Sequence, residues 1–207
     1  MNIKIKSEQL AYWYLRLNGF LSITNFIVHP DFGGEQRTDV DIVGVRFPHR
    51  AELLVNPMQD DRAFCEFNRP YIIIAEVKRR ECNLNGPWVN QDSCNMQRVL
   101  RAIGALPQDK IDEAADSIYE KGFYSNDSYF TTLCCFGETL NPDIEKRFSS
   151  VPQKLWDEVL RFIFHRFRLY PIQKASLGQW GIDGRKLWDC YEHCQTDDEF
   201  IDNILIL

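Results

Sequence analysis

Residues 71–80, with the sequence YIIIAEVKRR, carry the clearest strand signal in the chain. Three consecutive isoleucines, Ile72 to Ile74, predict a central β-strand that is covered on both faces of a sheet. Glu76 and Lys78 follow this apolar run, and such charged side chains are costly to bury unless they are paired or bind a metal ion. The segment therefore predicts a buried strand with a charged site at its end.

Apolar periodicity and turn residues on either side of this strand predict the other elements. We expect strands at residues 20–29, 38–47, 71–79 and 129–136, a turn at 30–34, and helices at 7–18, 92–103, 111–119, 155–169, 185–193 and 197–205. The order α-β-β-β-α-α-β, followed by further helices, indicates an α/β fold. Its centre is expected to be a mixed four- to five-stranded sheet flanked by helices.

The chain has 207 residues, of which 44% are apolar and 26% charged. This length and composition suit one globular core with an extension. We expect the core at residues 1–137, a long polar insertion at 48–70, and a helical extension at 138–207 that packs on the core. A connection as long as the insertion is usually functional or mobile.

A second strand supplies acidic residues that can meet Glu76. Residues 38–47 read TDVDIVGVRF, and side chains alternate between the two faces of a strand. The alternation puts Asp39 and Asp41 on one side and Val40 and Ile42 on the other, as it puts Glu76 and Lys78 together. Asp41, Glu76 and Lys78 can therefore share one face of the sheet, whereas Asp39 could equally face solvent.

This residue set matches the chemistry of phosphodiester cleavage. Carboxylate oxygens bind a hard cation such as Mg²⁺, which polarises the phosphate and lowers the pKa of a bound water. A neighbouring lysine can orient or deprotonate that water and offset charge in the transition state. The alternative is a structural ion pair on a half-exposed sheet, because an ExK triplet alone is a weak signal.

The ordered set Glu8, Asp41 and Glu76-Val77-Lys78 resembles the PD-(D/E)xK, or restriction-endonuclease-like, nucleases, most closely the Holliday-junction-resolvase and Mrr-type branch. The resemblance covers about residues 7–136. It implies Mg²⁺ or Mn²⁺ as cofactor, held by Asp41, Glu76 and the backbone carbonyl of Val77, with Lys78 as the catalytic lysine. It also implies that Glu8 is an auxiliary acid, although an acid in the first turn of a helix is stabilising there without any catalytic role.

The net charge of −6 argues against a protein that holds nucleic acid by bulk positive charge. A local basic edge is nevertheless expected beside the active strand, at Arg79, Arg80, Gln97, Arg98 and Arg101. A second stripe, Arg161, His165 and Arg168, could touch nucleic acid or neutralise acids such as Asp157 and Glu158. Each stripe could also be a solvated helix face.

Other features have two interpretations. Cys190, His193 and Cys194 have a helical spacing that can hold zinc, with Cys82 and Cys94 as further candidates, but free thiols are the simpler reading of seven scattered cysteines. Trp88 could anchor its loop or stack on a base. The sequence has no apolar leader and no apolar stretch of bilayer length, so we expect a cytoplasmic protein with no membrane partner.

Two functions follow from these residues. The first is a metal-dependent nuclease, most simply a DNA endonuclease. The second is a catalytically inactive module with a nuclease fold that acts through a protein partner or a second copy of itself. The acid-rich segment at residues 197–202 and the apolar end Ile204-Leu205-Ile206-Leu207 motivate the second function.

Overall fold

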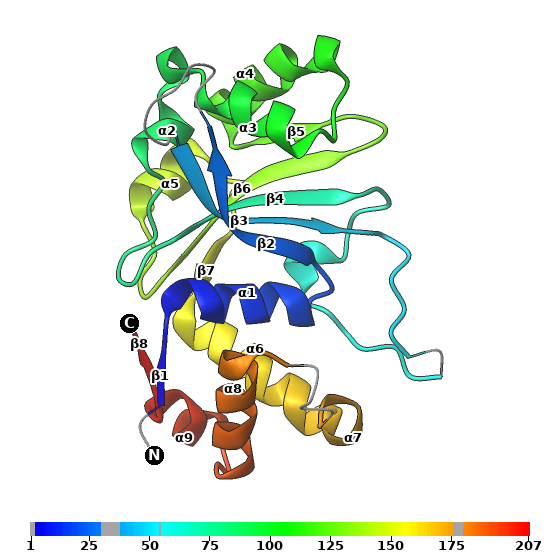
Figure 1. Ribbon diagram of the computed structural model, residues 1–207, viewed down its shortest axis with the longest axis vertical. Helices are drawn as coiled ribbons and strands as arrows, with labels where there is room; N and C mark the ends of the chain where they lie inside the picture. Colours follow the sequence, from blue (N-terminus) through cyan, green and yellow to red (C-terminus); the bar gives the residue numbers. More distant parts are fainter. Residues whose placement is uncertain (1–2, 30–37, 54, 176–179) are drawn as a thin grey trace.

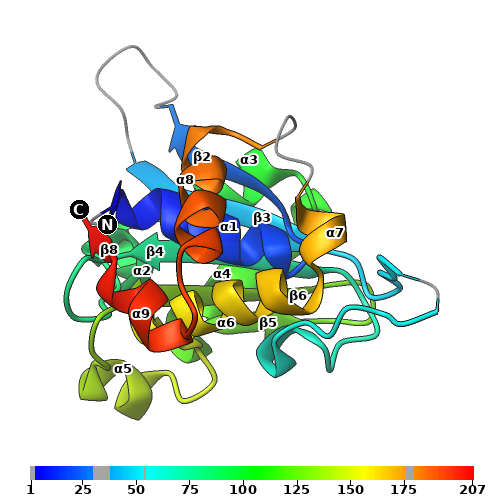
Figure 2. The same cartoon turned by 90° about the horizontal axis from the view of Figure 1, so that it is seen from below.

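A computed structural model describes residues 3–29, 38–53, 55–175 and 180–207 (Figure 1). The predicted turn at residues 30–34 lies outside these ranges. The described chain forms a mixed sheet between two layers of helices, which is an α/β architecture. Figure 2 shows the helical layer on one side of this sheet, with α1 and α6 lying across it.

The central sheet has six strands, one or two more than the sequence predicts. Their order is β2-β3-β4-β6-β5, and β7 adds to β6. The pairs β2–β3, β3–β4 and β5–β6 are antiparallel, whereas β4–β6 and β6–β7 are parallel. The strands are β2 (Leu21–Val28), β3 (Thr38–Arg46), β4 (Tyr71–Val77), β5 (Phe123–Ser125), β6 (Phe130–Gly137) and β7 (Gln153–Leu155).

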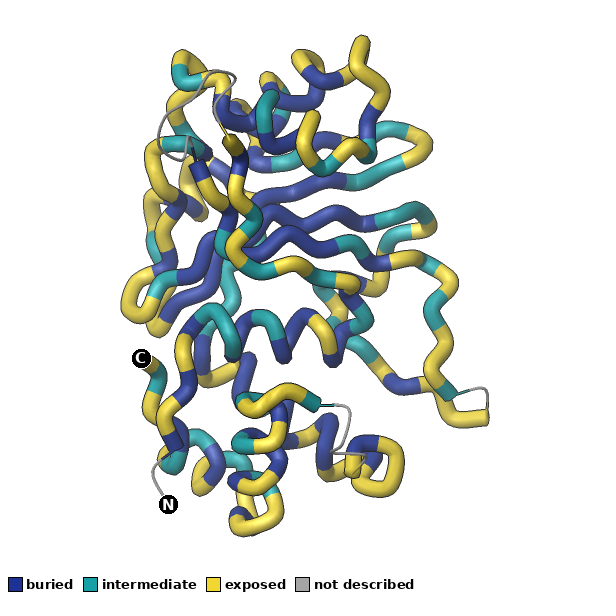
Figure 3. Tube along the Cα trace, in the orientation of Figure 1, coloured by how far each residue is buried: buried dark blue, intermediate teal, exposed yellow. Residues whose placement is uncertain are grey.

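Strand β4 lies between β3 and β6, and every residue in it is buried (Figure 3). Ile73, Ala75 and Val77 pack in one apolar cluster with α1 (Ser7–Leu17) and α6 (Trp156–Leu169). Ile74 packs in a second cluster with α3 (Asn95–Ile103) and α4 (Ile111–Lys121) on the opposite face. The isoleucine run is therefore a central strand with both faces covered, as its composition predicts.

Shorter elements complete the two helical layers. The helices α2 (Gly86–Val89) and α5 (Pro142–Arg147) belong to the side of α3 and α4, and α8 (Ile182–Glu192) belongs to the side of α1. The remaining helices are α7 (Pro171–Lys174) and α9 (Asp197–Asp202), and the 3₁₀ turns are at Arg62–Phe64, Gln91–Ser93 and Gln108–Lys110.

The segment after residue 137 contributes strands as well as helices. Strand β7 joins the central sheet, and β8 (Ile204–Ile206) pairs in parallel with β1 (Ile3–Ile5) to form a second, two-stranded sheet. The helix predicted at residues 197–205 is therefore wrong in its last part, because α9 ends at Asp202. The apolar residues that follow bury Ile204 against the core while they pair with β1.

Two adjacent acids attach the long connection between β3 and β4 to the core. Asp60 is almost fully buried and forms ion pairs with Arg46 of β3 (2.8 Å) and Arg166 of α6 (3.0 Å). Asp61 accepts a hydrogen bond from the Tyr14 hydroxyl (2.5 Å) and pairs with Lys154 of β7 (2.9 Å). This half of the predicted insertion is thus an integral part of the packed core.

Strands β2 and β3 bend where Asn25 lies opposite Asp41. Asn25 has a left-handed backbone (φ 52°), and no regular pair is formed there between the flanking pairs Thr24–Ile42 and Phe26–Val40. On either side of the bend Val40 and Ile42 pack in different apolar clusters. The prediction that these two side chains share a face is therefore wrong, because the bend interrupts the alternation.

Candidate active site

The charged site lies at the C-terminal end of β4. Glu76 is the only acid of this strand, its residue is 3% exposed, and its Oε1 accepts from Lys78 Nζ at 2.6 Å. Lys78 lies one residue beyond the strand, where its backbone N–H donates to the carbonyl of Phe136 in β6 (2.9 Å). The expectation that Glu76 and Lys78 meet is thus confirmed.

Two further side chains donate to the Glu76 carboxylate. Trp88 Nε1 donates to Oε2 at 2.6 Å, and Asn85 Nδ2 donates to Oε1. Trp88 is 1% exposed and packs in the cluster beneath α3 and α4, so its ring is not available to stack on a base. Sequence reasoning missed this role, since nothing in the spacing of residues 76, 85 and 88 indicates that they meet.

Asp41 approaches the same strand end from β3. The β3–β4 ladder stops at the pair Ile42–Ala75, and Asp41 Oδ2 accepts from the next free N–H of β4, that of Val77, at 2.7 Å. Burial raises the pKa of Asp41 to about 6, and the nearby charge of Glu76 adds to the rise. The Val77 N–H and the Lys78 ammonium act in the opposite direction.

Glu8 stands in the first turn of α1, near this site. Its negative charge also raises the pKa of Asp41, although less than burial and Glu76 do. Ser7 Oγ donates to Glu8 Oε2 over a long 3.4 Å. Glu8 opens onto a surface groove beside the bend of β2 and β3, lined by Lys6, Glu8, Gln9, Asn25 and Leu207. Both readings of Glu8, helix-stabilising and auxiliary, are compatible with this position.

The donor set suits a hard divalent cation that keeps water and substrate ligands. Within the described ranges, no three His, Cys, Asp or Glu side chains gather closely enough to hold a metal ion by themselves. Two carboxylates, those of Asp41 and Glu76, lie at this end of β4. Mg²⁺ is commonly bound in this way, through one or two carboxylates, with water and substrate phosphate completing its octahedron.

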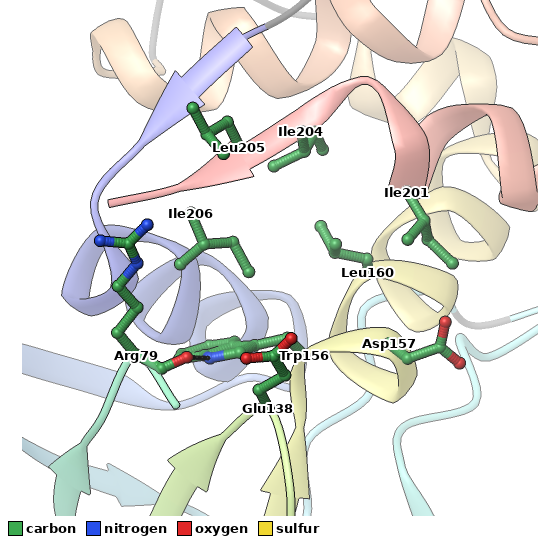
Figure 4. A pocket seen from close by; sticks show the side chains of 9 residues that line it. All are labelled: Arg79, Glu138, Trp156, Asp157, Leu160, Ile201, Ile204, Leu205 and Ile206. Carbon is green, nitrogen blue, oxygen red and sulfur yellow. Dashed lines mark hydrogen bonds between the residues drawn. The ribbon is translucent and has the colours of Figure 1, made fainter. Parts of the chain in front are cut away.

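The basic residues expected beside the site occupy two different places. Arg79 and Arg80 are exposed directly after Lys78, whereas Gln97, Arg98 and Arg101 lie on α3, where Arg101 is exposed and the other two are half-buried. Figure 4 shows Arg79 at the rim of a groove that also contains Trp156 and Ile206. Trp156 Nε1 donates to the carbonyls of Lys78 (3.2 Å) and Arg79 (3.1 Å), which fixes the backbone after the lysine.

The second basic stripe neutralises acids. Arg161 pairs with Asp157 (2.9 Å), Asp197 (2.7 Å) and Asp198 (2.7 Å), which leaves it little capacity for a phosphate. His165 Nε2 also contacts Asp197, at 3.3 Å. Arg168 donates to the carbonyl of Gln195 at 2.9 Å. This stripe therefore attaches α6 to the segment around α9.

The described residues do not support the hypothesis of a zinc site at Cys190, His193 and Cys194. All seven cysteines are free thiols. Cys190 and Cys194 lie with their sulfurs 4.0 Å apart, but His193 is exposed and its Nδ1 bonds to the carbonyl of Asp189 (2.6 Å). Cys82 is buried on the other side of the molecule's sheet, in the cluster that contains Trp88. These cysteines therefore do not converge on one ligand set.

No protein-family model, curated protein or solved structure matches this chain. In the part of the chain that the structure describes, no helix combines the length and the apolar character that a bilayer crossing requires. Function must therefore be argued from the site itself.

Proposed function

We propose that the protein is a Mg²⁺- or Mn²⁺-dependent nuclease of the PD-(D/E)xK type with a restriction-endonuclease-like core, and that its substrate is DNA. One observation carries the proposal. A nearly fully buried glutamate, Glu76, lies at the end of a central strand with Lys78 against it, and Asp41 is held at the same strand end. The order of these residues and the spacing of Glu76 and Lys78 resemble the nuclease motif, whereas the connection from Asp41 to Glu76 is longer than the family's short hairpin.

Each residue has a defined part in this proposal. Asp41, Glu76 and the Val77 carbonyl would hold the cation, which polarises the scissile phosphate and lowers the pKa of bound water. Lys78 has the position to orient that water or to offset charge that develops on the phosphate. Its side chain is 30% exposed, so its ammonium can meet a substrate from solvent while it stays near Glu76.

Placing these charged side chains together in a poorly solvated site costs free energy, which favours a catalytic role over a structural ion pair. A buried ion pair contributes little net stability compared with apolar residues of the same volume. The site adds a second acid, Asp41, whose pKa is raised by burial and by Glu76, so its charged form costs more free energy here than it does in water. Such clusters of unfavourably placed charge are typical of functional sites, and a bound cation would relieve them.

Metal titration and DNA cleavage test the proposal together. In calorimetry, we expect the wild type to bind Mn²⁺ and the Asp41→Ala variant to show no measurable Mn²⁺ affinity. Cleavage of supercoiled, linear and branched DNA with Mg²⁺ or Mn²⁺ should fall on the order of 10²- to 10⁴-fold in Lys78→Ala, the usual contribution of such a group. Glu76→Ala should be inactive.

The matched controls are Glu120→Ala and Lys121→Ala, because both residues are exposed on α4, away from the strand end. Both variants should cleave DNA like the wild type. Unchanged cleavage in Glu76→Ala or Lys78→Ala would reject the nuclease assignment, and cleavage without any divalent cation would reject the metal.

A second candidate function is an inactive nuclease-fold module that binds a protein partner. The apolar groove between β8 and α6 favours it, because Leu160, Ile201 and Ile206 line a surface that carries only a few charges at its rim (Figure 4). A complex recovered equally well with wild type and with Asp41→Ala/Glu76→Ala, together with absent metal binding, would favour this module. A monomer without a partner in sizing and pull-down experiments would reject it.

A further inference from the structure

We propose that Trp88 and Asn85 are positioning residues for Glu76: their side-chain N–H groups fix the carboxylate in the orientation in which it binds the cation. This inference rests on the proposed metal site and assigns it a supporting layer that the motif residues do not include. Trp88 Nε1 donates to Oε2 at 2.6 Å, and Asn85 Nδ2 donates to Oε1.

Asn85 does not make the hydrogen bond that is usual at its position in the chain. It occupies the N-cap position of α2, where an asparagine side chain usually accepts from the first turn of the helix. Here its side chain makes no capping hydrogen bond and instead reaches Glu76, nine residues earlier in the chain. A residue that is merely structural at this position would be expected to cap the helix.

Trp88 is buried with its indole N–H bonded to Glu76. Its residue is 1% exposed, and a buried indole N–H needs an acceptor. Its acceptor is the carboxylate of the site. A charge-assisted bond of this kind is shorter and about twice as strong as a neutral one, so the buried indole restrains the Glu76 carboxylate.

The short helix α2 that carries Trp88 is itself fastened from two sides. The Tyr119 hydroxyl of α4 donates to the carbonyl of Pro87 at 3.4 Å and accepts from the N–H of Met96 at 3.0 Å. Arg147 Nη2 of α5 donates to the carbonyl of Val89 at 3.1 Å. The indole that restrains Glu76 is therefore attached to the helical layer rather than to a loose loop.

The bonding pattern also limits how Glu76 can meet a cation. A carboxylate offers about four lone-pair positions. Trp88 occupies one on Oε2, and Lys78 and Asn85 occupy two on Oε1. This leaves room for one bond to a cation while the carboxylate stays in place. Groups that orient a ligand in this way change metal affinity by about 10- to 100-fold when they are removed.

NMR of the indole N–H groups tests the proposal directly on the wild-type protein. The chain has five tryptophans, so five indole signals are expected, and Trp88→Phe identifies one of them. Titration with Mg²⁺ should shift the Trp88 signal, because a cation on Glu76 withdraws charge from its acceptor. The Trp188 signal is the internal control, since this residue is buried among the aromatic rings of α6 and α8, away from Glu76.

Calorimetry with Mn²⁺ supplies the second measurement. Trp88→Phe keeps an aromatic ring but loses the donor, and we expect its Mn²⁺ affinity to fall at least about 10-fold. Asn85→Ala, at an exposed position, should lose a smaller factor with an unchanged melting temperature. The matched control Trp188→Phe should bind Mn²⁺ like the wild type.

The outcomes separate this inference from the proposed function. If the wild type binds Mn²⁺ but the Trp88 signal does not move on Mg²⁺ addition and both variants bind normally, the positioning role is wrong and the nuclease proposal stands. If the wild type binds no divalent cation, both fail together. If Trp88→Phe does not fold, triple-resonance spectra of the wild type assign the Trp88 indole signal, so the titration still decides the inference.

Discussion

At the scale of single residues, hydrogen bonds from protein N–H groups hold the two carboxylates of the site in place. Asp41 takes the N–H of Val77, and Glu76 takes Trp88, Asn85 and Lys78. Both carboxylates are therefore fixed by the fold before any ligand arrives. Fixing the groups in advance reduces the reorganisation needed when a substrate binds, but it concentrates negative charge in a poorly solvated place.

We predict that Asp41→Asn stabilises the metal-free protein at neutral pH. The pKa of Asp41 is raised from 3.8 to about 6, so the folded state holds the proton more tightly than the unfolded state does. Stability is therefore lost as the pH rises from about 4 to 6, and the full cost is present above pH 6. The shift alone corresponds to about 3 kcal/mol, which partial exposure reduces to about 1–2 kcal/mol.

Urea unfolding in the presence of EDTA measures this effect. Asp41→Asn should unfold at higher urea than the wild type at pH 8, and the difference should shrink toward pH 4.5. Asp39→Asn is the matched control, because Asp39 is exposed on the same strand. A lower stability of Asp41→Asn at pH 8 would contradict the assigned burial of this charge.

At the scale of elements, the backbone of β6 at Gly137 lies very close to the segment that follows Lys78 at the end of β4. A Cβ at this position would lie 2.5 Å from the N of Cys82 and 2.6 Å from the carbonyl oxygen of Arg80. The segment that follows Lys78 would have to move away from β6. Gly137→Ala should therefore lower the free energy of unfolding by about 1–3 kcal/mol and reduce Mn²⁺ affinity.

Gly181→Ala is the control for Gly137→Ala, since a Cβ at Gly181 meets nothing within 4 Å. Chemical denaturation and calorimetry should leave Gly181→Ala close to the wild type. If Gly137→Ala matched the wild type in both measurements, the contact between β6 and the segment after Lys78 would not matter for the site.

A second element-scale prediction concerns the connection between β3 and β4. Asp60→Ala should destabilise the protein by about 3–5 kcal/mol, the usual cost when one partner of a buried ion pair is removed. Its side chain is 3% exposed, and its loss would leave Arg46 and Arg166 charged and buried. Glu113→Ala is the control: its side chain is 57% exposed and pairs with the exposed Lys110, so little change is expected in urea unfolding. Equal effects of the two substitutions would contradict the buried network.

The sequence predicts the elements that have a strong local signal. The isoleucine run identifies β4, and helical periodicity identifies α6, because these segments are long and their faces differ. The strands β5, β7 and β8 have three residues each, which is too short for any periodicity to be read. They form because a neighbouring strand offers them partners, which is a tertiary effect.

Only contacts within a short segment of the chain can be predicted from local sequence patterns, and this also holds for the candidate site. The pair Glu76–Lys78 is predicted because both residues belong to one short segment. The contacts from Trp88 and Asn85 depend on how α2 folds back over the strand end, and no local pattern encodes that. The bend at Asn25 and Asp41 also escapes prediction, since strand alternation assumes a regular ladder.

At the scale of the whole molecule, charge decides how a substrate can be held. The net charge is −6, and Arg161 is already engaged by three aspartates. The exposed arginines among those expected to meet a phosphate backbone are Arg79, Arg80 and Arg101. A protein of this charge that contacts DNA through so few cations should bind it weakly and with a shallow salt dependence.

We predict a slope of about −2.7 for log K against log[NaCl], because each of the three phosphates neutralised by Arg79, Arg80 and Arg101 contributes about −0.9. Arg79→Ala and Arg101→Ala should each reduce the magnitude of the slope by about 1 and weaken binding to all sequences alike, since phosphate contacts carry no sequence information. Fluorescence anisotropy with a labelled duplex in Ca²⁺, at several NaCl concentrations, measures both effects. Arg161→Ala is the control and should keep the wild-type slope. A slope near zero, or one changed only by Arg161→Ala, would mean that DNA contacts neither Arg79 nor Arg101 and that affinity must come from a partner.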